Sequence, residues 1–221
     1  MRKMITVKIN GEERQYPQGA TYEDVANDYQ QEYENLIALA ARDGKIRELF
    51  KKLTRDCEVT FFTLKDDVGN KTYVRSATML FLKAVFDVYG REAAQSCRVE
   101  FAIGNGSYIS PKGKINVTEE NAAKIRNRMR ELVEAKTPFL KKSYSLDNAM
   151  ELFRREGMKD KEKLFRYRRG SFVNIYEMDG YYDYYYGYML PNAGYVKWFD
   201  VIAYEDGFML LLPDKKNSHA C

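Results

Sequence analysis

The chain has 221 residues, 45% of them hydrophobic, and its 36 Lys and Arg stand against 32 Asp and Glu, a formal net charge of +4. A chain of this length can form one large or two small domains. Because the positive and negative charges nearly balance, the net charge alone does not argue for nucleic-acid binding. Three widely spaced cysteines without a C-x-x-C pair favour free thiols in the cytoplasm, and no run of about 20 apolar residues predicts a membrane span.

The first 64 residues predict a small α+β unit. Residues 4–9 alternate apolar and polar side chains, as a half-buried strand does, and Asn10-Gly11 is a two-residue hairpin turn into a second strand at 12–16. Thr21 is a suitable N-cap for the helix that follows. Further strands are predicted at 36–41, 45–48 and 58–63. This order resembles the TGS domain, a ubiquitin-like β-grasp fold found in threonyl-tRNA synthetases, some GTPases and stringent-response enzymes.

Residues 65–70 are polar and rich in turn formers, which predicts a linker between two domains. The second domain is expected to be α+β and to cover residues 71–213, with a polar tail at 214–221. Its helices are predicted at 72–89, 118–135, 147–156 and 161–167. Its strands are predicted at 99–103, near Tyr108, and in short runs after Ser171, where β-branched and aromatic residues dominate.

Residues 180–192, GYYDYYYGYMLPN, carry the most specific motif of the chain. This stretch resembles the Y-x-D-x-C-R-G-P-H-x-P-N segment of the threonyl-tRNA synthetase editing domain, whose metal-binding Cys and His fall on Tyr185 and Met189. Residues 73–85, YVRSATMLFLKAV, resemble the R-H-S-x-A-H-L-L helix of the same domain. Its two histidines fall on Arg75 and Met79.

All four ligand positions implied by this resemblance hold side chains that do not ligate zinc, which takes thiolate, imidazole or carboxylate donors. We therefore expect no metal and no other cofactor in this chain. The resemblance places a pocket at the former metal position, and its expected lining is Arg75, Thr78, Met79, Asp183, Tyr185 and Met189, with Tyr108 at the edge. Arg75 could pair with a phosphate or carboxylate there. In the alternative interpretation Arg75 is a solvated charge and Met79 a core residue.

Six tyrosines lie between positions 181 and 188. If the segment is a strand, Tyr182, Tyr184, Tyr186 and Tyr188 share one face, opposite Tyr181, Tyr185 and Met189. Packing of one set in a core and stacking of bases on an aromatic face both remain open. The basic run at 161–170 is likewise either a solvated helix or a set of RNA contacts. The single histidine, His219, argues against a Ser/His/Asp or Cys/His catalytic site.

The whole chain resembles the N-terminal half of bacterial uridine kinase-type proteins, in which such domains precede a P-loop kinase. No P-loop pattern occurs here, so we expect a fragment, with ATP and Mg bound only by the missing kinase domain. The leading hypothesis is a non-catalytic regulatory module of a nucleoside kinase. Its expected partners are tRNA or a small nucleotide or amino acid, the attached kinase and a second copy of itself, with no membrane.

Two other functions remain open at this point. One is a metal-independent hydrolase of aminoacyl-tRNA or a related ester, in which Asp183 and Tyr185 polarise a water. The other is a structural adaptor or dimerisation module.

Overall fold

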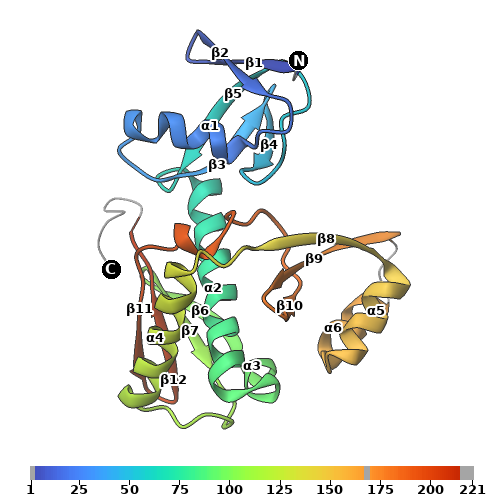
Figure 1. Ribbon diagram of the computed structural model, residues 1–221. Coiled ribbons are helices and arrows are strands. Elements are labelled where there is room, and N and C mark those ends of the chain that lie inside the picture. Colours follow the sequence, from blue (N-terminus) through green and yellow to red (C-terminus); the bar gives the residue numbers. More distant parts are fainter. Residues whose placement is uncertain (1–2, 167–169, 215–221) are drawn as a thin grey trace.

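The structure is a computed structural model that describes residues 3–166 and 170–214. Predictions for the tail beyond Asp214, for His219, and for 167–169 in the basic run fall outside these residues. A five-stranded sheet at one end and a larger α+β part at the other are connected by one long helix, α2 (Asp67–Tyr89), as Figure 1 shows. The predicted α+β class is therefore confirmed. Of the helices in the described residues, none has both the length and the apolar character needed to cross a membrane.

The N-terminal sheet has the strand order β2-β1-β5-β3-β4, with β1 and β5 parallel and the other pairs antiparallel. Its strands are β1 (Met4–Ile9), β2 (Glu12–Pro17), β3 (Ile37–Arg42), β4 (Lys45–Glu48) and β5 (Cys57–Thr63). Helix α1 (Tyr22–Tyr29) and the short 3-10 helix η1 (Gln30–Glu32) follow the first hairpin. One apolar cluster, which includes Val7, Val25 and Val59, forms the core of this unit.

Local turn and cap chemistry determines the first three elements. Asn10 and Gly11 have φ values of 51° and 88°, the positive angles that a two-residue hairpin of this kind needs. Thr21 accepts a hydrogen bond from Asp24 N, and the Asp24 side chain accepts one from Thr21 N, which completes a capping box. The predicted turn and helix start are both confirmed.

Residues 67–70 of the stretch predicted to be a linker form the first turn of α2, so the linker prediction is wrong for them. Asp66 precedes the helix and its Oδ2 accepts from Thr63 N at 2.7 Å, which ties the helix start to the end of β5. Gly69 is buried against the same backbone. A polar, turn-rich sequence fits a helix N-terminus as well as a linker, since Asp is favoured at both. The two parts are consequently connected by continuous helix.

Gly69→Ala should lower the free energy of unfolding by about 2–3 kcal/mol, because overpacking against fixed backbone cannot relax. A Cβ added at Gly69 would lie 2.0 Å from the Thr63 carbonyl oxygen. Urea denaturation measures the change, and Lys71→Ala, an exposed position two residues along the same helix, is the matched control. An unchanged or raised stability in Gly69→Ala would show that α2 begins later than Asp67.

In the larger part, α2 and α4 (Glu119–Glu134) contact each other and pack on a four-stranded sheet with the order β11-β12-β7-β6 (Figure 1). The sheet strands are β6 (Arg98–Ile103), β7 (Gly106–Ser110), β11 (Asp200–Tyr204) and β12 (Gly207–Leu211). Phe81 of α2 contacts Phe208 of β12 with ring centroids 6.3 Å apart. The short helix α3 (Arg91–Ser96) follows α2. Leu36 and Ala38 of the N-terminal unit join the same core.

A three-stranded sheet, ordered β10-β9-β8, extends from this core and carries two helices at its far end (Figure 1). Its elements are β8 (Leu140–Ser145), α5 (Leu146–Arg155), α6 (Lys159–Arg166), β9 (Phe172–Met178) and β10 (Tyr181–Asp183), and the 3-10 helix η2 (Ala193–Tyr195) follows. Strand β8 is not predicted by the sequence analysis. The strand predicted through 181–189 ends at Asp183, so the alternation of the tyrosines beyond it is wrong.

Candidate functional site

Helix α2 presents Arg75 to the irregular segment that follows β10. Arg75 Nη1 donates to the Tyr188 carbonyl oxygen at 2.7 Å, and a Cβ added to Gly187 would lie 2.6 Å from Arg75 Cζ, so only glycine allows this approach. Burial lowers the pKa of the Arg75 guanidinium from its usual value. Arg75 is thus half-buried and not the solvated charge of the alternative interpretation. Within the described residues this is its one hydrogen bond, although a guanidinium has five N–H groups.

A buried carboxylate from the N-terminal unit reaches the same segment. Glu48, at the end of β4, is 3% exposed and receives Lys141 Nζ at 2.9 Å. The Tyr176 hydroxyl oxygen lies 2.5 Å from Glu48 Oε1 and 3.0 Å from the Gly187 carbonyl oxygen, and its single hydrogen goes to the charged acceptor. Met189 N donates to Glu48 Oε1 at 3.3 Å. Burial, and then the Glu48 charge, raise the pKa of Tyr176.

The Tyr185 ring packs edge-on against the Tyr176 ring, with the two ring centroids 6.5 Å apart. Its hydroxyl is buried and has no hydrogen-bond partner among the residues that the structure describes. Burial raises the pKa of this phenol well above its usual value, so the group is a neutral donor. A buried polar atom without a partner costs about 1–3 kcal/mol. An acceptor bound beside Tyr185 would recover that energy.

The two methionines at the former ligand positions belong to the core. Met79 and Met189 have no exposed surface, and Met189 Sδ lies 3.9 Å from Ser76 Oγ of α2. Ser76 Oγ also accepts from Leu190 N at 2.9 Å, which fixes this backbone on the helix. Arg75, Tyr185 and Met189 are therefore brought to one place around Tyr176 and Ser76.

The other predicted site residues make contacts elsewhere. Tyr108 donates to Asp206 and stacks on Phe101 at 4.8 Å between centroids. Asp183 is 5% exposed and accepts from Tyr184 N at 2.7 Å, while its carboxylate pairs with Lys161. Within the described residues, the Arg75 guanidinium forms no hydrogen bond or ion pair with Thr78, Met79, Tyr108 or Asp183. Thr78 Oγ1 is bound to Val74 O of its own helix at 2.8 Å.

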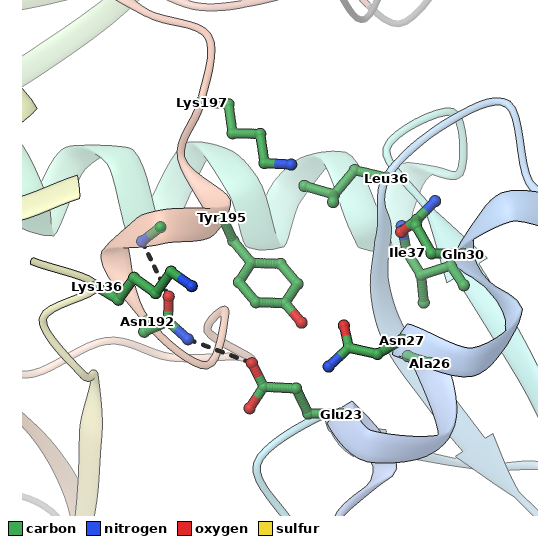
Figure 2. Close-up of a pocket in the computed structure, with 11 residues that line it drawn as sticks. Glu23, Ala26, Asn27, Gln30, Leu36, Ile37, Lys136, Asn192, Tyr195 and Lys197 are labelled. Atoms are coloured by element: carbon green, nitrogen blue, oxygen red, sulfur yellow. Dashed lines mark hydrogen bonds between the residues drawn. The ribbon is translucent and has the colours of Figure 1, made fainter. Parts of the chain in front are cut away.

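A pocket of about 270 Å³ lies away from these residues, where the N-terminal unit meets the larger part (Figure 2). Asn192 Nδ2 donates to Glu23 Oε1 at 3.3 Å across this boundary, and Lys136 and Lys197 border the pocket. Tyr195 packs against the cores of both units, and burial followed by the Glu23 charge raises its pKa. Asn192 was recognised as part of the motif, but its pairing with residue 23 leaves no signal in the sequence.

The donor set at the former ligand positions does not fit a zinc ion. Arg75 is a cation, Tyr185 a neutral phenol, and Met79 and Met189 are thioethers, so that no thiolate, imidazole or carboxylate is supplied. In the described part of the chain, no group of three or more His, Cys, Asp and Glu side chains could hold a metal. A guanidinium and a neutral phenol are hydrogen-bond donors that suit a carboxylate, a phosphate or a carbonyl instead.

The fold and site define an α+β protein that resembles an editing domain, and the comparisons agree with this class. The chain is 29% identical to the threonine-tRNA ligase of Thermotoga maritima over 207 residues, 90% of the chain and 30% of that protein. The corresponding enzyme of Porphyromonas gingivalis is 24% identical over 194 residues, and that of Maricaulis maris 27% over 193. The chain spans about three tenths of the length of these curated relatives. No protein-family model matches the chain.

Proposed function

We propose that the chain is a non-catalytic, metal-independent binding module of the editing-domain type. It recognises RNA, or a small ligand with a carboxylate or phosphate, at the site formed by Arg75 and Tyr185, and it regulates an attached kinase of the uridine kinase type. The observation that carries this proposal is that two groups near Tyr176 have unused hydrogen-bonding capacity: the half-buried Arg75 guanidinium makes one hydrogen bond in the described residues, and the buried Tyr185 hydroxyl makes none.

The similarity to threonine-tRNA ligases supports the RNA part of the proposal. It extends over 90% of the chain, including the N-terminal unit. The strand order of that unit, with its first and last strands parallel, supports the expected TGS-like β-grasp fold. Because the names of these relatives include tRNA, tRNA is the first RNA to test.

The hydrolase alternative has less support. A general base needs a carboxylate oxygen within reach of the water that it activates. Asp183 is instead engaged by Lys161, by Tyr184 N at 2.7 Å and by the Tyr181 hydroxyl at 3.3 Å. The Tyr185 ring contacts Tyr176, and its hydroxyl forms no hydrogen bond to Asp183 within the described residues. A binding role needs no free carboxylate, so the site fits binding better than hydrolysis.

Arg75→Ala should weaken ligand binding roughly ten- to a hundredfold, since a lost charged hydrogen bond costs about 1.5–3 kcal/mol. A thermal-shift screen with nucleosides, nucleotides, amino acids and tRNA would identify the ligand, and titration would give the affinities. Lys71→Ala, which removes an exposed charge one turn earlier on the same helix, should leave them unchanged.

Tyr185→Phe separates binding from folding at this site. Removing a buried hydroxyl that has no partner should leave the free protein equally or more stable, while the ligand loses its hydrogen bond. If Arg75→Ala and Tyr185→Phe both keep full affinity for every ligand found, the proposed site is wrong and a structural adaptor is the better account.

A further inference from the structure

A second surface, which we name the lysine groove, lies beside the pocket of Figure 2 and shares Glu23, Lys136 and Asn192 with it. Its volume is about 640 Å³, and both parts of the molecule form its walls. Five lysines line it against one carboxylate. They are Lys51 and Lys52, shortly after β4, Lys136, just after α4, and Lys141 and Lys142 in β8, and the carboxylate is Glu23.

The lysines differ in how far their charge is already compensated. Lys141 is held by the buried Glu48 at 2.9 Å, and Lys142 pairs with Glu177 at 2.5 Å. Lys51, Lys52 and Lys136 are exposed, and no carboxylate of the described residues lies within ion-pair distance of them. These three charges therefore remain available to a ligand. Their concentration is unusual in a chain whose total formal charge is only +4.

Apolar side chains also line the groove. They include Pro138, Leu140, which is 43% exposed, and Pro191. Phe50 lines it too, and the Lys51 Nζ lies over the Phe50 ring, 5.2 Å from its centroid. Lysines along an open groove attract an anion without fixing its orientation, since an ammonium is a point charge with rotatable donors. An aromatic ring within the groove adds a face on which a base can stack.

We propose that the lysine groove binds a chain of consecutive phosphates. Three free cations that line one groove match a ligand with several negative charges, and a single carboxylate would use only one of them. Both the backbone of single-stranded RNA and the polyphosphate of a nucleotide have this chemistry. If the phosphates belong to RNA, the inference rests on the proposed function; if they belong to a nucleotide, it does not. Neither Arg75 nor Tyr185 lines the groove, so variants of the two sites can be tested separately.

Fluorescence anisotropy with a labelled oligouridylate, and competition by a nucleoside triphosphate and by inorganic triphosphate, test the proposal. Three contacts predict a slope of about −2 in a plot of log K against log salt, at about −0.7 per phosphate of a single strand. The double variant Lys51→Glu/Lys52→Glu should weaken binding at least tenfold and make the slope shallower by about 1.4. The control Lys8→Glu/Lys45→Glu changes the net charge equally at two exposed positions outside the groove, and it should bind nearly as the wild type.

The outcomes separate the sources and the proposals. Tighter binding of the oligonucleotide than of either triphosphate identifies a nucleic-acid backbone, and the reverse identifies a nucleotide. Loss of affinity in Arg75→Ala but not in the groove variants supports the proposed function and overturns the groove. The groove is likewise overturned if no phosphate ligand binds, if an acidic peptide binds while phosphates do not, or if the control double variant loses as much affinity as the groove variant. Circular dichroism checks that both double variants are folded.

Discussion

Glu48→Ala should lower the free energy of unfolding by about 3–5 kcal/mol, the usual cost of removing one partner from a buried ion pair. The substitution leaves Lys141, whose side chain is 16% exposed, without its carboxylate, and it leaves the Tyr176 hydroxyl without its nearest acceptor. It also removes the carboxylate that joins the N-terminal sheet to β8, β9 and the Met189 backbone. Urea denaturation followed by circular dichroism measures the loss.

Two variants control for the nature of this effect. Glu13→Ala removes an exposed carboxylate from β2 of the same unit, and a surface change of this kind stays within about 0.5 kcal/mol. Glu48→Gln keeps an acceptor for Tyr176 but removes the charge that pairs with Lys141. Its loss in free energy of unfolding should therefore fall between those of Glu13→Ala and Glu48→Ala. A loss below 1 kcal/mol in Glu48→Ala would mean that Glu48 does not hold the two parts together.

The sequence predicts elements whose causes are local. The hairpin at Asn10-Gly11 and the helix start at Thr21 depend on residues within three positions of each other, and both are present. Glu48 could not be found in this way. It is the last residue of a short hairpin strand and looks like an exposed acid, and its partner Tyr176 is 128 residues away. Only docking of the two units buries it.

The tyrosine segment shows where periodicity stops being informative. Alternation assumes a regular strand, but the strand ends at Asp183 and Gly187 has φ +130°, where the backbone turns against Arg75. A glycine in a strand pattern signals such a close approach, yet it does not say what approaches. Residues one turn apart on α2, Arg75 and Met79, were placed correctly on one helix. How their side chains pack depends on the segment that crosses them.

Placing metal ligands at the four former positions should create a zinc site. The combined variant Arg75→His/Met79→His/Tyr185→Cys/Met189→His supplies three imidazoles and a thiolate, four donors of the kinds that zinc takes in tetrahedral sites. The structure favours their convergence, because Arg75 contacts the backbone at 187–188 and Met189 Sδ lies 3.9 Å from Ser76 on the same helix. We expect one zinc per chain by elemental analysis, and a stabilisation of about 2.7 kcal/mol when free zinc reaches a hundred times Kd.

The wild-type chain is the first control, since its donors do not fit zinc, and neither added zinc nor EDTA should move its melting temperature. The variant that keeps Met189 but carries the other three changes has one strong ligand fewer and should bind zinc more weakly. Imidazoles at the two buried methionines remove apolar packing from the core, so the metal-free variant should be less stable than the wild type. Folding that depends on added zinc would therefore support convergence. A combined variant that folds without zinc and binds none would show that the four positions do not meet, and the likeness of this site to an editing domain would end at the backbone.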